Sequence, residues 1–226
     1  MNGRGDVKML WALWLIFAGF LAGINGIESA EGKPIKILAL GTSLTQGYNL
    51  PPGTDYCAVL QAKLRAKGFD VVVVNAGVSG DTSAGGLSRI DWALAEPVDG
   101  AIVELGANDA LRGLDVQETR KNIDGVVLSL KRRGIVVLLA GMKSPRNLGA
   151  EYAASFDALY PEIAARHKVL LYPFFLDGVA ADLKLNQADG IHPNEKGSQV
   201  IVRRILPFVE KLIGQIKAKP ANAPTP

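Results

Sequence analysis

Five short apolar runs recur along the chain from residue 35 onward, and each is continuous rather than alternating with polar residues. They are rich in Val, Ile and Leu, which is typical of strands covered on both faces of a parallel sheet. The runs span residues 35–40, 71–75, 101–105, 135–140 and 169–172. We therefore predict a sheet of five buried strands.

The segments between these runs show helical spacing of apolar residues. We predict helices at about residues 56–67, 85–93, 116–133, 151–166 and 195–217. Alternation of strands and helices is typical of a parallel sheet flanked by helices. In such sheets, ligands bind outside the carboxyl ends of the strands.

Polar residues follow several of the predicted strands at the point where each strand ends. Ser43 follows the first strand, residues 75–82 follow the second, and residues 105–109 follow the third. A further polar segment, residues 189–192, directly precedes the last helix. The topology therefore brings these segments together at one edge of the sheet.

Histidine is rare in this chain, with only two occurrences. His192 lies three residues after Asp189, and a serine hydrolase needs an imidazole as base and a carboxylate to hold its tautomer. Ser43 lies on the turn that leaves a strand, where a nucleophile can be presented. The other histidine, His167, ends a predicted helix, where a positive charge is favourable. Together these residues predict an esterase-type enzyme.

Each of these residues also has a structural interpretation. Ser43 could cap a helix, and Asn108 and Gly80 could serve turns. His192 could be a surface residue after a turn, and Asp109 suits loop stabilisation better than acid–base chemistry. Cys57 is interpreted as a core residue.

Composition indicates one compact domain. The chain has 226 residues, of which 48% are apolar and 21% charged, and its formal net charge is +3. The basic residues are scattered, so we predict no nucleic-acid partner. The single cysteine, Cys57, permits no internal disulfide and gives no redox clue to the compartment.

The N-terminal segment has the layout of a secretory signal. Arg4 and Lys8 precede an uncharged apolar run over residues 9–24. We expect residues 1–30 to form a signal peptide cleaved near Ser29–Ala30, or else a retained anchor that would be the only membrane contact. The protein would then be periplasmic or secreted. Residues 31–217 form the predicted catalytic domain, and residues 218–226 a disordered tail.

Four blocks, in this order, resemble the SGNH (GDSL-type) hydrolase superfamily, most nearly its exported bacterial thioesterase/lysophospholipase/arylesterase branch. They are the turn at Ser43, Gly80-Asp81-Thr82, the stretch from Val103 to Gly113, and the stretch from Asp189 to Asn194. The resemblance implies a flavodoxin-like three-layer α/β/α sandwich around a five-stranded parallel sheet. It also implies Ser43 as nucleophile, His192 as base, Asp189 as its partner, and Ser43, Gly80 and Asn108 as oxyanion donors.

The implied reaction is hydrolysis of carboxylic esters and thioesters through an acyl-enzyme, with no metal or cofactor required. The sequence departs from the family at one position, because Thr42 precedes Ser43 where the family signature has aspartate. Aspartate at that position is not a triad member, so the mechanism survives. We expect the Thr42 hydroxyl to replace part of its hydrogen bonding.

Substrate preference is the least defined property. Leu111, Leu114, Met142 and Leu148 lie in loops after strands and could form an apolar wall for an acyl chain, or could only pack those loops. The expected substrates are small-molecule or lipid esters. A carbohydrate O-acetylesterase and a non-catalytic binding module on the same fold are the alternatives. The sequence does not determine the oligomeric state.

Overall fold

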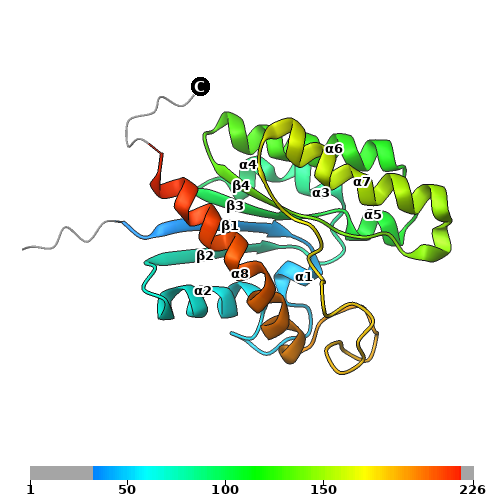
Figure 1. Cartoon of the computed structure of the whole chain (residues 1–226), viewed down its shortest axis with the longest axis horizontal. Coiled ribbons are helices and arrows are strands. Elements are labelled where there is room, and N and C mark those ends of the chain that lie inside the picture. The colour runs from blue at the N-terminus through cyan, green and yellow to red at the C-terminus, as the bar shows by residue number, and fades with distance from the viewer. Residues whose placement is uncertain (1–32, 220–226) are drawn as a thin grey trace, which may run out of the picture. The chain divides into compact units, whose positions relative to one another are not determined.

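The computed structural model describes residues 33–219. The predicted leader and residues 220–226 of the predicted tail lie outside the described residues. Five parallel strands form one sheet in the order β2-β1-β3-β4-β5 (Figure 1). The strands are β1 (Ile35–Gly41), β2 (Val71–Gly77), β3 (Gly100–Glu104), β4 (Val136–Ala140) and β5 (Leu170–Tyr172). The predicted fold, a parallel sheet between two helical layers, is confirmed.

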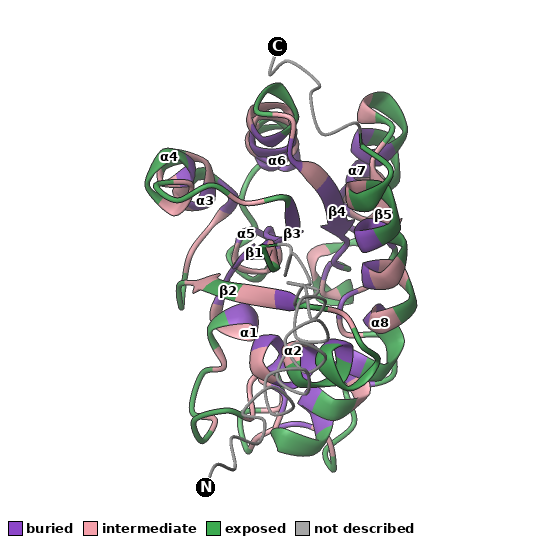
Figure 2. Cartoon of the chain, turned by 90° about the vertical axis from the view of Figure 1, so that its left-hand side faces the viewer, coloured by how far each residue is buried: buried purple, intermediate pink, exposed green. Residues whose placement is uncertain are grey.

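Helices cover both faces of the sheet. Helices α2 and α8 contact each other and the sheet on one face, while α6 and α7 contact each other and the sheet on the other, with α3 beside α6. Their inward sides are buried, as Figure 2 shows in purple. The longer helices are α2 (Tyr56–Ala66), α6 (Val116–Arg132), α7 (Ala150–His167) and α8 (Glu195–Lys217), and the shorter ones are α1 (Ser43–Gln46), α3 (Ser83–Ser88), α4 (Ile90–Ala93), α5 (Ala107–Leu111) and the 3₁₀ turn η1 (Arg146–Leu148).

Local sequence explains where these helices begin. Asp55, Asp115 and Asn194 precede α2, α6 and α8, and each side chain accepts backbone N–H groups of the first helical turn. Such caps satisfy donors that have no partner within the helix. The predicted helix over residues 85–93 is instead two short helices, α3 and α4, separated at Arg89. Among residues 33–219, no helix is both long and apolar enough to cross a membrane.

The strand order places the first three strand ends side by side. β1 lies between β2 and β3, and the chain leaves β1 toward one side of the sheet and β3 toward the other. Crevices form at such switch points, outside the carboxyl ends of the strands. The segments after β1, β2 and β3 carry Ser43, Gly80 and Asn108 respectively. The fold therefore gathers the candidate residues as the sequence analysis predicted.

Candidate active site

Ser43 is the first residue of α1, directly after β1. Thr42 is the N-cap, and its hydroxyl oxygen accepts the Leu44 N–H at 3.3 Å. Gly41, the last residue of β1, is closely approached by the side chains of Thr45 and Glu104, since a Cβ there would stand 2.0 Å from the Thr45 hydroxyl oxygen and 2.6 Å from Glu104 Oε2. This close approach favours glycine, and the chain that leaves β1 there presents the Ser43 side chain at the sheet edge.

His192 bridges Ser43 and Asp189. Its Nε2 lies 2.9 Å from the Ser43 Oγ, although the two residues are 149 positions apart in the sequence. Its Nδ1 lies 2.7 Å from Asp189 Oδ2. The other carboxylate oxygen, Oδ1, accepts the backbone N–H groups of Ile191 and His192, both at 3.0 Å. These hydrogen bonds from His192 and Ile191 lower the pKa of Asp189 to about 2, so the carboxylate stays charged at neutral pH.

Two residues that the sequence analysis missed hold the histidine loop. The Tyr48 ring packs on the His192 ring, with centroids 4.7 Å apart and planes tilted by 39°. Gln187 donates its side-chain amide to the carbonyls of Tyr48 and Pro193 and its backbone N–H to the His192 carbonyl. No local sequence pattern reveals these contacts, because Gln187 and Tyr48 are 139 positions apart.

Gly80 and Asn108 face the same cavity as Ser43. Gly80 has φ +78°, a conformation that favours glycine, and its carbonyl accepts Arg112 Nη2 at 2.8 Å. Asn108 Nδ2 donates to the Asp81 carbonyl at 2.8 Å, which uses one of its two amide hydrogens. The two loops are therefore tied to each other, and the second amide hydrogen of Asn108 has no partner in these contacts.

Asp109 and His167 serve the structure rather than the cavity. Asp109 is 2% exposed and accepts the Ser83 N–H and hydroxyl, which ties α5 to the start of α3. His167 ends α7, and its Nε2 lies 2.9 Å from Asp124 Oδ1. Cys57 is buried in the core, as predicted. Within residues 33–219, no cluster of three or more His, Cys, Asp or Glu side chains is arranged to hold a metal ion.

A fully buried carboxylate, Glu104, lies beneath the serine turn and was not identified from the sequence. It accepts the Thr42 N–H at 3.0 Å, the Thr42 hydroxyl at 3.1 Å and the Thr45 hydroxyl at 2.8 Å. The Thr42 hydroxyl therefore connects this carboxylate with the cap of α1. That it replaces part of the hydrogen bonding of the family's aspartate stays a prediction. Burial raises the pKa of Glu104 to about 7, and the donors from Thr42 and Thr45 offset part of that rise.

The raised pKa of Glu104 predicts that stability falls as pH rises. Between pH 4.5 and 7 the folded protein keeps the Glu104 proton, whereas the unfolded chain has lost it. The free energy of unfolding should therefore decrease by about 3 kcal/mol across this interval, at about 1.4 kcal/mol per pKa unit. Urea unfolding at a series of pH values measures this slope.

The Glu104→Gln variant should flatten that slope, because its amide does not titrate. Glu118 is an exposed carboxylate on α6, so Glu118→Gln should keep the slope of the unmodified protein. A slope equal in Glu104→Gln and in the unmodified protein would contradict the assignment of the raised pKa to Glu104.

The cavity beside Ser43, here called the main cavity, has a volume of about 650 Å³. Apolar side chains dominate its wall, and its lining includes Leu44, Leu111, Met142, Pro145, Phe174 and Leu176. Of the four predicted contacts, Leu111 and Met142 line this cavity. Leu114 and Leu148 do not; they line a separate hollow beside the start of α7. The paths of the loops carry these two side chains away from Ser43.

The sequence matches the GDSL-like lipase/acylhydrolase family over residues 39–200. It is 36% identical over 200 residues to Esterase TesA of Pseudomonas aeruginosa, covering 88% of this chain and 98% of that protein. It is 37% identical over 166 residues to Thioesterase 1/protease 1/lysophospholipase L1 of Escherichia coli K12, covering 73% of this chain and 78% of that protein.

A solved structure supports the same relationship. The crystal structure of AlinE4, an esterase of the SGNH-hydrolase family, matches with a TM-score of 0.68 and 45% sequence identity, covering 80% of this chain and 97% of that chain. Both the sequence match and the fold therefore agree with the geometry around Ser43. The chain belongs to the GDSL-like lipase/acylhydrolase (SGNH hydrolase) family, and it is an ester hydrolase.

Proposed function

We propose that Ser43, His192 and Asp189 form the catalytic triad of this hydrolase. The observation that carries the proposal is the position of His192. Its Nε2 lies 2.9 Å from Ser43 Oγ, and its Nδ1 lies 2.7 Å from Asp189 Oδ2. With Nδ1–H donated to Asp189, Nε2 is free to accept the serine proton. No other histidine among the described residues contacts the main cavity.

The proposed reaction has two steps, acylation of Ser43 and hydrolysis of the acyl-enzyme. Ser43 Oγ attacks the acyl carbon while His192 Nε2 takes its proton, and His192 then returns that proton to the departing alcohol or thiol. Water attacks the resulting acyl-enzyme with His192 again accepting the proton, and collapse releases the acid and restores Ser43. The carbonyl oxygen becomes an oxyanion in both steps, with the Ser43 and Gly80 N–H groups and the Asn108 amide as donors. One such donor typically contributes about a hundredfold to a thousandfold in rate.

The proposed substrates are carboxylic esters and thioesters with medium or long acyl chains, of the arylesterase, lysophospholipase or acyl thioesterase type. The apolar wall of the main cavity supports an acyl chain there, and it favours such substrates over the acetyl group of a carbohydrate O-acetylesterase. The names of the relatives agree with these classes. We also propose export to the periplasm or beyond the cell, which rests on the apolar run after Arg4 and Lys8.

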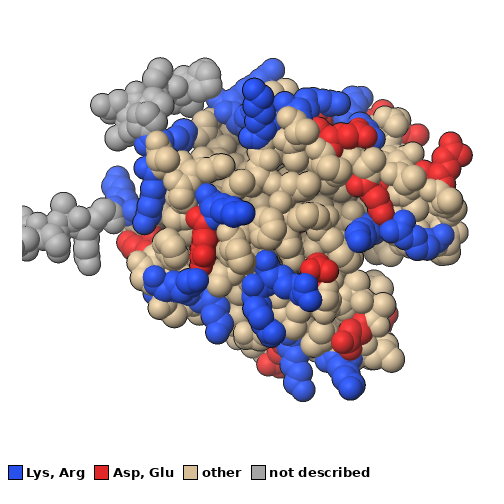
Figure 3. Space-filling view, in the orientation of Figure 1, with Lys and Arg blue, Asp and Glu red and all other residues tan. Residues whose placement is uncertain are grey.

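The distribution of surface charge suits a small-molecule or lipid substrate. Figure 3 shows basic side chains in separate groups with acidic ones among them on this face. Salt bridges pair charged side chains among the described residues, for example Lys36 with Glu96 and Arg204 with Asp177. Nucleic-acid binding needs a concentrated basic surface instead.

Labelling with a fluorophosphonate followed by peptide mapping tests the nucleophile, and hydrolysis of p-nitrophenyl esters from acetate to palmitate tests the substrate class. We expect the label on Ser43 and the highest kcat/KM on medium or long chains. Hydrolysis of acetate alone would favour the acetylesterase. Absence of both label and turnover would contradict the proposed triad.

A further inference from the structure

A second hollow adjoins the main cavity and has no role in the triad chemistry. This side hollow has a volume of about 460 Å³ and is lined by Lys143, Tyr172, Pro173, Phe174, Asp177, Arg204 and Phe208. Two of these residues, Lys143 and Phe174, also line the main cavity. They therefore form the partition between the two spaces.

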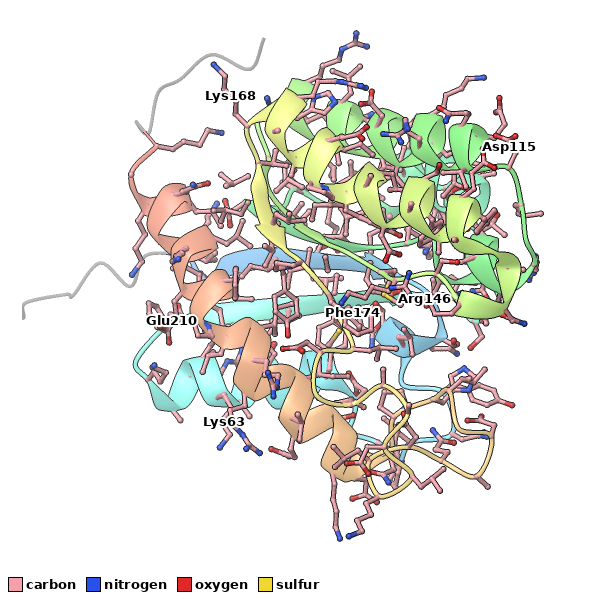
Figure 4. The ribbon with its side chains drawn as sticks, turned by 45° about the vertical axis from the view of Figure 1, so that its right-hand side comes forward. Lys63, Asp115, Arg146, Lys168, Phe174 and Glu210 are labelled. Carbon is pink, nitrogen blue, oxygen red and sulfur yellow. The ribbon has the colours of Figure 1, made fainter. Side chains whose placement is uncertain are left out.

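The backbone around Phe174 is held firmly. Gly141 donates to the Tyr172 carbonyl, and its own carbonyl accepts the Phe175 N–H, both at 2.8 Å. Phe175 is fully buried and packs edge-on against Tyr56, with ring centroids 5.1 Å apart. Phe174, the residue before it, is partly exposed and lines both the main cavity and the side hollow. Figure 4 shows Phe174, with Arg146, near the start of the loop that follows β5.

Lys143 holds the other side of the partition. Its Nζ lies 5.0 Å from the centroid of the Phe174 ring, within the range of a cation–π contact. Lys143 follows β4 and Phe174 follows β5, so the contact joins the ends of two neighbouring strands. The ring is thereby restrained between the two hollows.

The side hollow itself is suited to apolar groups. Tyr172 and Phe208 pack together there with ring centroids 4.9 Å apart, and its charged Arg204 is paired with Asp177 at 2.5 Å. The Tyr172 hydroxyl is buried and has no hydrogen-bond partner among the described residues. The rings of Tyr172, Phe174 and Phe208 give this hollow aromatic walls that can accept additional methylene groups, and its other polar groups are the Lys143 ammonium and the Tyr172 hydroxyl.

We propose that Phe174, restrained by Lys143, determines the longest acyl chain that this enzyme accommodates well. The proposal rests on the proposed function, since it assumes that the acyl chain occupies the main cavity. The Phe174 ring closes the main cavity where it adjoins the side hollow. An acyl chain long enough to reach the ring therefore buries no further methylene groups. Removing the ring connects the two spaces, and each methylene that enters the side hollow should raise kcat/KM by up to about fourfold (about 0.8 kcal/mol).

The test is the ratio of kcat/KM for long to medium p-nitrophenyl esters, measured on the full chain. In Phe174→Ala we expect the optimum to move to chains at least two carbons longer, and Phe174→Leu should give a smaller shift in the same direction. Lys143→Met should also shift the ratio toward longer chains, because the ring loses its restraint. Lys211→Met is the matched control: Lys211 Nζ stands 5.6 Å from the Phe208 ring but lines neither space.

A double variant tests where the longer chain goes. Phe208 lines the side hollow but not the main cavity. Introducing Phe208→Leu into Phe174→Ala should therefore remove part of the gain on long esters. An unchanged chain-length profile in both Phe174 variants, or an equal loss at every chain length, would overturn the proposal. Failure of the proposed function would show differently, as absence of Ser43 labelling and of hydrolysis in the unmodified protein.

Discussion

The Ser43→Ala and His192→Ala variants are each expected to lose about 10⁶-fold in kcat while remaining folded, a magnitude typical of such triads. In Ser43→Ala no oxygen is present to form the acyl-enzyme. In His192→Ala the Ser43 hydroxyl has lost the group 2.9 Å away that accepts its proton. Steady-state hydrolysis of a p-nitrophenyl ester, with circular dichroism to verify folding, measures the loss.

Because the two residues act as one unit, the double variant should be scarcely slower than either single variant. His167→Ala is the matched control. It removes an imidazole whose Nε2 lies 2.9 Å from the Asp124 carboxylate, where the end of α7 meets α6, and neither residue lines the main cavity. A comparable loss of kcat in His167→Ala would contradict the assignment of His192 as the base. Multiplicative losses in the double variant would show that Ser43 and His192 do not act together.

The pattern of apolar residues predicted the sheet and the long helices because burial on both faces leaves a direct record in the sequence. Most residues of β1, β3 and β4 are buried and apolar, and the predicted limits of these strands agree with the structure within one residue. The convergence of Ser43 and His192 could be predicted as well. Parallel strands bring their carboxyl ends to one edge, and the chain offers only two histidines as a base.

Other features depend on contacts that short segments do not reveal. Helices α1 and α5 have four and five residues, too few to show a periodicity. Leu114 and Leu148 were placed at the main cavity because their loops follow strands, but only the observed paths show that they turn away. Glu104 ends an apolar strand, and its partners Thr42 and Thr45 are about 60 positions earlier in the chain.

In the proposed triad, Asp189 holds His192 in the one tautomer that can accept the serine proton. Its Oδ2 lies 2.7 Å from His192 Nδ1 and accepts the Nδ1–H of that tautomer, and its Oδ1 accepts two backbone N–H groups of the same turn. These bonds keep the pKa of Asp189 near 2, so its charge persists well below neutral pH. The stabilisation from these bonds is complete above about pH 4 and is lost as the pH falls toward 2.

Asp189→Asn should therefore lower kcat by about 10⁴-fold with little change in KM, because the asparagine NH₂ can face Nδ1 and favour the tautomer with hydrogen on Nε2. That hydrogen would point at Ser43 and prevent proton transfer. Asp182→Asn is the matched control, since Asp182 accepts the Lys184 N–H in the same loop but contacts no imidazole. We expect its kcat to be unchanged. The rate of fluorophosphonate labelling should fall in parallel with kcat in Asp189→Asn only. If Asp189→Asn kept more than about a tenth of the activity, the carboxylate would not be controlling the tautomer, and His192 would have to be oriented by Tyr48 and Gln187 instead.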